Sequence, residues 1–242
     1  MLRLTEIKRV AAEVGFDACG VARAEALRDD EYPLHEWLAR GWHGALTYME
    51  RNIDKRLDPR LLVEGARSVI CVVSAYGAPD PARHDGVAAY AQRREYHEAV
   101  KTMLYTLKSR LGIEGKVCCD TVPISDKHWA ARAGLGWIGR HTLLITPQWG
   151  SWVNLGEIVT PEEVDSYDTP LPASHSTCDA CGRCVEACPN HAIAPDGLPM
   201  IDVRRCTSYY TTHHPQPLPH GLDARGYTRG CDICQLACPF NQ

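Results

Sequence analysis

The sequence Cys178-Asp-Ala-Cys181-Gly-Arg-Cys184-Val-Glu-Ala-Cys188-Pro189 decides how the last third of the chain is built. Its cysteines are separated by two, two and three residues, and a proline follows the last of them. This spacing is typical of iron–sulfur ligation, in which three neighbouring thiolates hold one [4Fe–4S] cluster and the fourth serves a second cluster. The motif therefore predicts two clusters.

A second cysteine motif, close to the C-terminus, supplies the remaining ligands. Cys231, Cys234 and Cys238, followed by Pro239, repeat the last three positions of the first motif, and Cys206 is the candidate for the missing first position. The expected wiring crosses between the two motifs. One cluster is expected on Cys178, Cys181, Cys184 and Cys238, and the other on Cys188, Cys206, Cys231 and Cys234.

Structural zinc is the alternative that these C-x-x-C pairs leave open, whereas the C-x-x-x-C-P endings favour the clusters. Disulfides are disfavoured because Met1-Leu-Arg-Leu-Thr runs directly into a helical pattern, so we expect no signal peptide and a cytoplasmic protein. The other four cysteines have apolar neighbours and are expected to be buried and reduced: Cys19, Cys71, Cys118 and Cys119.

The composition sets the remaining limits. With 242 residues, of which 45% are hydrophobic, the chain suits one large domain or a medium domain with a small one. No apolar run approaches the roughly 20 residues that a membrane span requires. The formal net charge is −4, so an anionic substrate would have to meet a local basic patch.

The pattern of apolar residues predicts both helices and strands before the cysteine motifs. Leu4, Ile7, Val10 and Val14 follow helical spacing, and the almost entirely apolar segment 68–74 predicts a strand buried on both faces. Helices are expected at 4–14, 32–41, 45–52, 95–111 and 126–133. Strands are expected at 16–22, 68–74 and 116–120, with a hairpin formed by 143–146 and 152–160.

Residues 161–176 are acidic, contain proline and serine, and follow no period, which predicts a linker. The expected fold class is α+β. A mixed-sheet domain over residues 1–165 would be followed by a ferredoxin-like domain with two [4Fe–4S] clusters over residues 166–242.

A double-cluster module passes single electrons, so the first domain needs an acceptor. Gly134, Gly136 and Gly139 form the string G-x-G-x-x-G, but a helix before and a strand after reverse the order of a dinucleotide site. We instead expect close backbone approach to a flat cofactor or a neighbouring strand.

Cobalamin is another candidate acceptor. Asp126-Lys-His128-Trp-Ala-Ala131 lacks the last glycine of the Asp-x-His-x-x-Gly string that supplies a histidine to cobalt, so no such ligand is expected.

Seven strings, in order along nearly the whole chain, resemble epoxyqueuosine reductases. They are Arg56-Leu-Asp-Pro, Gly65-Ala-Arg-Ser-Val-Ile70, Tyr90-Ala-Gln-Arg-Arg-Glu-Tyr96-His97, Asp120-Thr-Val-Pro, Ala133-Gly-Leu-Gly-Trp-Ile-Gly139, Gly150-Ser-Trp-Val-Asn-Leu-Gly-Glu157 and Cys231-Asp-Ile-Cys-Gln-Leu-Ala-Cys-Pro-Phe-Asn241.

The resemblance implies an oxidoreductase that reduces epoxyqueuosine to queuosine at the wobble position of tRNA. It implies cobalamin and two [4Fe–4S] clusters as cofactors, the tRNA anticodon stem-loop as substrate, and an external one-electron donor such as flavodoxin or ferredoxin. It also implies a monomer that does not bind membranes, related to reductive dehalogenases. Many members continue past the cluster region into helical repeats that help to grip tRNA, whereas this chain ends at Gln242.

The resemblance also assigns roles to residues. Asp120 would donate a proton to the epoxide oxygen, with a pKa raised by the apolar neighbours Val117, Cys118 and Cys119; capping the turn at 121–123 is its alternative role. The cluster of Cys206 would be the one nearer cobalt. Contacts with cobalamin are implied for Arg56, Ala88, His97, Leu144, Leu155, Ser208 and Tyr210.

Basic residues are candidates for phosphate contacts, although each one alone could be a solvated surface charge. They are Lys55, Arg56, Arg60, Arg93, Arg94, Lys127, Arg132 and Arg140. Two other function classes remain open at this point. One is a reductive dehalogenase-like corrinoid reductase of a small molecule, and the other is a non-catalytic electron-transfer ferredoxin or corrinoid carrier.

Overall fold

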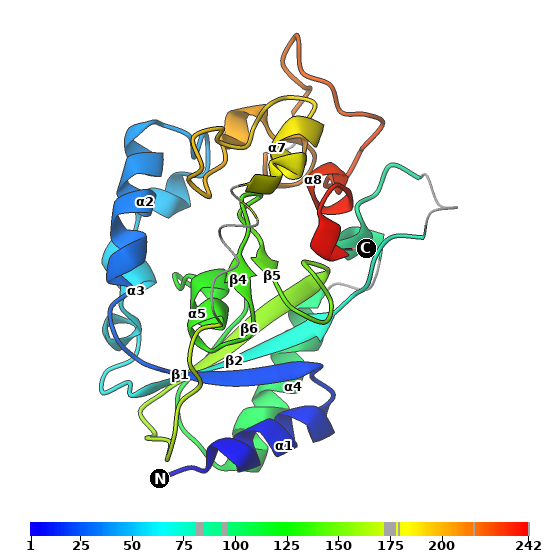
Figure 1. The fold of residues 1–242 in the computed structure, drawn as a ribbon. Coiled ribbons are helices and arrows are strands. Elements are labelled where there is room, and N and C mark those ends of the chain that lie inside the picture. Colours follow the sequence, from blue (N-terminus) through cyan, green and yellow to red (C-terminus); the bar gives the residue numbers. More distant parts are fainter. Residues whose placement is uncertain (81–84, 93–95, 172–177, 179, 215, 242) are drawn as a thin grey trace.

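A four-stranded sheet forms the centre of the first domain in the computed structural model, which describes residues 1–80, 85–92, 96–171, 178, 180–214 and 216–241 (Figure 1). The strand order is β1 (Ala18–Arg23), β2 (Ser68–Ala75), β6 (Val153–Thr160) and β3 (Lys116–Cys118). Every pairing in this sheet is antiparallel. The predicted α+β class is confirmed, with antiparallel pairing among the described strands where a mixed sheet was expected.

The strand β2 is buried on both faces, as its unbroken apolar sequence predicts. Val69, Cys71 and Val73 face one core, and Ile70 and Val72 face the other, because successive side chains of a strand alternate between the two sides of a sheet. The helices α1 (Leu4–Val14) and α4 (Tyr96–Leu111) cover the second core. The helix α5 (Asp126–Arg132) covers the first.

The segment between β1 and β2 forms short helices along one side of the molecule (Figure 1). These are α2 (Arg28–Ala39), η1 (Thr47–Glu50), α3 (Ile53–Leu57) and η2 (Pro59–Leu61). The helix expected at 45–52 is only the 3₁₀ turn η1, because Gly44 and Asn52 on either side of it adopt positive φ angles of 55° and 56°. A further 3₁₀ turn, η3 (Ala89–Gln92), precedes α4.

The predicted hairpin of 143–146 with 152–160 is wrong. β5 (Leu144–Ile145) pairs with β4 (Trp137–Ile138), while β6 joins the central sheet between β2 and β3. The expected close approach at the glycine-rich segment involves a neighbouring strand. A Cβ atom on Gly136 would lie 2.2 Å from the carbonyl oxygen of Ile145. Glycine is therefore required for the two short strands to pair.

The expected linker is partly packed on the first domain. Val164 bridges to Leu2, and Asp165 accepts a hydrogen bond from the N–H of Leu4 at the start of α1. Asp168 contacts Lys8 at 2.6 Å and accepts from the N–H of Val21 at 2.9 Å. Residues 172–177 lie outside the described part of the chain. The division into 1–165 and 166–242 stays a prediction, and the packing of Asp168 would move its boundary toward the C-terminus.

The cluster region consists of short helical turns at one end of the sheet (Figure 1). They are α7 (Arg183–Ala187), η4 (Val203–Arg205), the π-helical turn η5 (Tyr209–His213), α8 (Ile233–Leu236) and η6 (Pro239–Asn241). None of the helices in the described part of the chain is long and apolar enough to cross a membrane.

Polar side chains join this region to the first domain around Ser151. Gln235 Nε2 donates to the Ser151 carbonyl oxygen at 2.9 Å, and Asn241 Nδ2 lies 2.9 Å from the Ser151 hydroxyl. The N–H of Ser151 donates to Asn241 Oδ1 at 2.7 Å. The preceding residue, Gly150, has a φ angle of 57°, and a Cβ atom there would lie 2.0 Å from Asn241 Oδ1. The junction thus depends on a residue without a side chain.

We predict that Gly20→Ala destabilises the protein by about 1–3 kcal/mol, because the added methyl group overfills a packed contact. A Cβ atom on Gly20 in β1 would lie 2.1 Å from the carbonyl oxygen of Ala133, which follows α5. The measurement is the urea midpoint of unfolding. The control is Gly197→Ala, whose φ angle is 89° but which has nothing within 4 Å of its Cβ position. A larger loss of stability at Gly197 than at Gly20 would contradict this packing argument.

Candidate functional site

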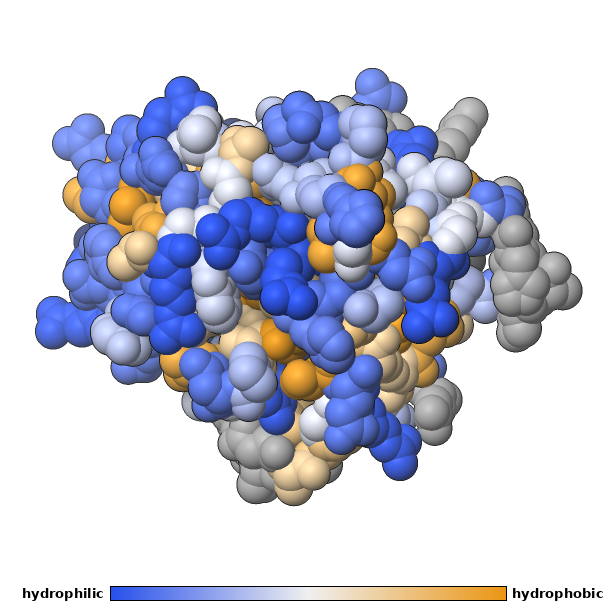
Figure 2. Space-filling view, turned by 90° about the horizontal axis from the view of Figure 1, so that it is seen from above, coloured by the Kyte–Doolittle hydropathy of each residue, from blue (hydrophilic) through white to orange (hydrophobic). Residues whose placement is uncertain are grey.

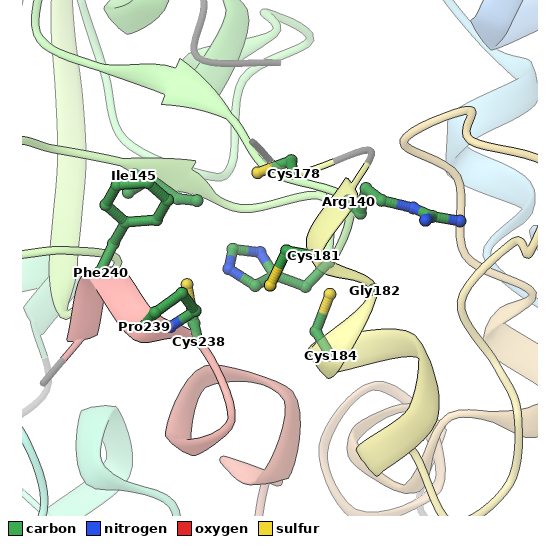
Figure 3. A pocket seen from close by; sticks show the side chains of 10 residues that line it. Arg140, Ile145, Cys178, Cys181, Gly182, Cys184, Cys238, Pro239 and Phe240 are labelled. Atoms are coloured by element: carbon green, nitrogen blue, oxygen red, sulfur yellow. The ribbon is translucent and has the colours of Figure 1, made fainter. Parts of the chain in front are cut away.

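Four cysteines from both motifs line one small cavity. Figure 3 shows Cys178, Cys181, Cys184 and Cys238 around this space, with Arg140, Ile145 and Phe240 beside them. Cys178 to Cys184 come from the first motif, whereas Cys238 comes from the turn after α8. The structure therefore brings together the first predicted ligand set. Four thiols around one space bounded by apolar side chains are a donor set that fits an iron–sulfur cluster.

The four thiols of the second predicted ligand set influence one another electrostatically. The pKa of Cys231 is raised to about 12, mainly by burial and also by the charges of Cys206 and Cys188. Burial is also the largest cause that raises the pKa of Cys234, and the charges of Cys231, Cys206 and Cys188 follow. Such mutual effects require short separations. Buried thiols of this kind would stay protonated unless a metal binds them as thiolates, so this set fits a second cluster as well.

A cavity of about 500 Å³ lies between the first domain and the cluster region. It is lined from α2, η1 and α3, from the start of α4, from the first residues of α5 and the turn before it, from residues 142–143, from the start of β6 and from the segment 199–201. Its walls combine aromatic and aliphatic side chains with several ionisable groups. Trp37, Tyr48, Met49, Leu57, Ile124, Leu143, Leu155 and Met200 are among the former. Such a lining is typical of a binding site for a sizeable organic ligand.

Asp120 reaches this cavity from the turn after β3. Its φ angle is 58°, in the left-handed region. The Tyr96 hydroxyl donates to Asp120 Oδ2 at 3.2 Å, and His97 Nε2 lies 2.9 Å from the same oxygen. Burial raises the pKa of Tyr96, so its phenol stays protonated and remains a donor. Two side chains from the first turn of α4 therefore orient the carboxyl group.

The expected burial of Asp120 by its apolar neighbours is wrong. Its side chain is 59% exposed, because it faces the cavity. Cys118 packs into the core under α5, while Val117 and Cys119 pack into the core on the other face of the sheet. Alternation along the strand thus directs all three side chains into the two cores and away from the carboxyl group.

Three further ionisable groups line the cavity and are held by one another and by the backbone. Lys127 Nζ donates to the carbonyl oxygen of Thr142 at 2.7 Å, and burial lowers its pKa to about 8. Burial also lowers the pKa of His128 to about 3, so this histidine is neutral, and its Nε2 lies 3.4 Å from Asp30. Burial raises the pKa of Asp30 to about 6. These groups give the wall little net charge.

The predicted cofactor contacts are only partly brought together. Arg56 and Leu155 line the cavity, and His97 touches it through Asp120. Leu144 is buried in the core beside the lining residue Leu143. Five of the seven predicted contacts are therefore absent from the described lining residues: Ala88, His97, Leu144, Ser208 and Tyr210. Ala88 packs next to Gly230 and the Tyr210 hydroxyl donates to the carbonyl oxygen of Arg204, which places both in the cluster region.

Several predicted phosphate contacts already have partners within the protein. Arg60 pairs with Asp58, Arg132 lies 3.7 Å from Asp29, and Arg140 donates to the carbonyl oxygen of Pro195. Arg93 and Arg94 lie outside the described residues. Figure 2, which views the molecule of Figure 1 from above, shows a face covered largely by hydrophilic side chains, with apolar groups in patches between them. The predicted basic contacts remain predictions.

Sequence reasoning missed the walls contributed by α2 and by residues 199–201. Trp37 donates from Nε1 to the carbonyl oxygen of Ile201 at 2.7 Å, which connects the two walls. Tyr48 stacks against the guanidinium of Arg56 at 5.9 Å. The sequence signal that could have indicated this wall was the aromatic content of α2. The helical periodicity of α2 is weak, so the sequence does not show which of its side chains face the cavity.

Family models match both parts of the chain. Residues 177–241 match the "4Fe-4S double cluster binding domain", and residues 56–123 match "Epoxyqueuosine reductase QueG, DUF1730". The cysteine geometry and the first match define the class: this is a double-cluster iron–sulfur protein with an α+β domain that encloses a cavity.

Curated relatives identify the family. The epoxyqueuosine reductase of Cyclobacterium marinum is 38% identical over 98% of this chain and 78% of its own length. That of Xanthomonas campestris is 39% identical over 98% of this chain and 69% of its own length. The chain belongs to the epoxyqueuosine reductase family, which makes it an oxidoreductase.

Solved structures agree. Epoxyqueuosine reductase from Streptococcus thermophilus superposes with a TM-score of 0.88 at 28% identity, covering 98% of this chain and 65% of that one. An epoxyqueuosine reductase crystallised with an epoxyqueuosine-modified tRNA stem loop gives a TM-score of 0.84 at 28% identity. The reductive dehalogenase NpRdhA shares the fold, with a TM-score of 0.60 at 18% identity. This chain spans about two thirds of the solved epoxyqueuosine reductases, 65% in the first case.

We predict that Cys238→Ala lowers the iron content from about eight to about four atoms per chain, because it removes one ligand from the first set only. Iron is measured after anaerobic reconstitution. The matched control is Cys71→Ala, a buried thiol in β2 outside both sets, which should keep about eight. Retention of about eight iron atoms by the Cys238 variant would show that the wiring is different.

Proposed function

We propose that this protein reduces epoxyqueuosine to queuosine in the anticodon stem-loop of tRNA, with cobalamin in the cavity and two [4Fe–4S] clusters beside it. The observation that carries this proposal is Asp120, whose carboxyl group faces a large, mostly apolar cavity, while the segment 140–145 lines both this cavity and the space between the four cysteines of the first set. Membership of the epoxyqueuosine reductase family supports the substrate.

The cavity fits a corrinoid in its chemistry. It offers aliphatic and aromatic walls of the kind that pack on a large flat ring, and Nε2 of its neutral His128 lies 3.4 Å from Asp30. Arg56, Tyr48 and Leu155 would hold the cofactor from the first domain. Bound cobalamin would supply a low-potential metal centre at which two electrons reach the substrate one at a time.

The reaction removes the epoxide oxygen as water and therefore consumes two electrons and two protons. Asp120 would donate one proton to that oxygen, since it is the cavity carboxyl group held by two side-chain contacts on one oxygen. Tyr96 and His97 keep that oxygen in place and leave the other oxygen of Asp120 to face the substrate. The ring stack between Tyr96 and His97, with centroids 4.0 Å apart, holds both side chains in place on α4.

The cysteine sets would carry electrons from the surface to the cavity. The second set, with Cys206, would stand nearer the cofactor, as the family resemblance implies. We propose that an external one-electron donor such as flavodoxin or ferredoxin supplies them, and that the protein works as a monomer in the cytoplasm, where tRNA is modified.

The test is turnover of an anticodon stem-loop that carries epoxyqueuosine, with protein reconstituted anaerobically with iron, sulfide and cobalamin and with a reduced flavodoxin as donor. Formation of queuosine is followed by mass spectrometry of the nucleosides. Absence of corrinoid uptake, or uptake without queuosine formation, would contradict the proposal.

We predict that Asp120→Asn lowers turnover by about 10²-fold or more, because the amide keeps the shape but has no acidic proton to transfer. The ultraviolet–visible spectra of the clusters and of bound cobalamin should not change. Asp54→Asn, at an exposed position of α3, is the matched control and should keep full activity. An Asp120→Asn protein that turns over as fast as the control would remove this carboxyl group from the mechanism.

A further inference from the structure

A second carboxyl group is buried directly behind the site. Glu157 in β6 is 0% exposed, and its strand neighbours are Cys71 in β2 and Cys118 in β3. Neither of its oxygens has an N–H or O–H donor among the described residues. The polar group that it meets is the carboxyl group of Asp126 at the start of α5.

Two carboxyl groups can hydrogen-bond only if a proton lies between them. Burial raises the pKa of Glu157 well above its usual value, and the nearby charges of Asp126 and Asp120 raise it further. Burial likewise raises the pKa of Asp126. Burial also raises the pKa of the thiols of Cys71 and Cys118. These groups, which face Glu157 from β2, β3, α5 and the turn after β3, offer no positive charge, so the surroundings favour a proton on the pair.

Asp126 connects this pair to the cavity. Its side chain lines the cavity, and its Oδ1 accepts a hydrogen bond from the backbone N–H of Asp120 at 3.4 Å. That N–H belongs to the residue with the left-handed φ angle of 58°. A non-glycine residue in this conformation costs free energy, so the turn needs contacts that hold it. The chain of contacts runs from the core through Asp126 to the backbone of Asp120.

We propose that Glu157 is a positioning residue, which donates a hydrogen bond to Asp126 and thereby holds the turn that presents Asp120 to the cavity. The inference rests on the proposed function for its effect on turnover, but not for its structural part. It explains why a carboxyl group occupies a core position at which an apolar side chain would pack without a desolvation cost.

Two substitutions of Glu157 can separate a hydrogen-bonding role from a packing role. Glu157→Met fills a similar volume without a hydrogen-bond donor. Glu157→Gln keeps a neutral donor of nearly the same shape. Under the proposal, Met lowers turnover about tenfold or more because the Asp120 turn loses its support, while Gln restores turnover to within about threefold of the wild type. If Glu157 were only a packing residue, both variants would be active.

Two measurements on the protein without substrate give the structural part its own test. Infrared spectroscopy should show the carbonyl stretch of a protonated carboxylic acid in the wild type, and Glu157→Gln should lack it. Hydrogen exchange at the amide of Asp120 should be faster in Glu157→Met than in the wild type and in Glu157→Gln. Absence of the carboxylic acid band, or equal exchange in all three proteins, would overturn the proposal.

Stability against pH gives a third readout. Because the folded-state pKa of Glu157 lies above its unfolded value of 4.5, its contribution to stability is complete below that value and is lost as pH rises toward the folded pKa. The Tm of the wild type should therefore fall more between about pH 5 and about pH 8 than that of Glu157→Gln. Parallel pH curves for the two proteins would contradict a protonated Glu157.

The outcomes for turnover are equally decisive. Full activity of Glu157→Met, or a Gln variant as inactive as Met, would overturn the positioning role, the latter because the titratable proton itself would then be required. If Glu157→Met does not fold, the comparison of wild type with Glu157→Gln by infrared and pH-dependent Tm still decides. A wild type that shows the acid band but no turnover would defeat the proposed function and leave the buried pair intact.

Discussion

The hydrogen bonds around Ser151 set the distance between the two halves of the protein. Gln235 and Asn241 both reach this residue; Cys234 directly precedes Gln235, and Cys238 is separated from Asn241 by Pro239 and Phe240. The contacts are local and polar, so they fix orientation as well as proximity. The short segment between β5 and β6 therefore helps to hold the cluster region against the cavity, together with contacts such as the hydrogen bond from Trp37 to the carbonyl oxygen of Ile201.

The cavity itself follows from how the central sheet is covered. β2 and β6 are buried by helices on both faces over most of their length. The first residues of β6, Val153 to Leu155, extend beyond α5 and form a wall of the cavity. The helix α2 and the segment 199–201 close the opposite side. Because these walls come from both halves, the site exists only when the cluster region is docked.

The motifs with chemical constraints could be predicted from the sequence, whereas the walls could not. Cysteine spacing reports ligation directly, so the convergence of Cys178 with Cys238 could be expected. The hairpin prediction failed because alternation shows that 153–160 is a strand and does not show its partner. The burial expected for Asp120 failed because sequence neighbours in a strand point into cores on either side. Residues such as Trp37 enter the site through tertiary packing, which leaves no local pattern.

Substitution of Gly150 by a larger residue would affect electron transfer rather than iron binding. Asn241 Oδ1 occupies the space that a methyl group would need, so any larger residue would push the C-terminal turn away from the sheet. All eight cysteines would remain, and iron could still bind, but the distance between the cysteine sets and the cavity would increase. Electron-tunnelling rates fall steeply with distance, so such a protein would keep the absorption spectrum of its clusters while electron transfer from them to the cavity would be slow.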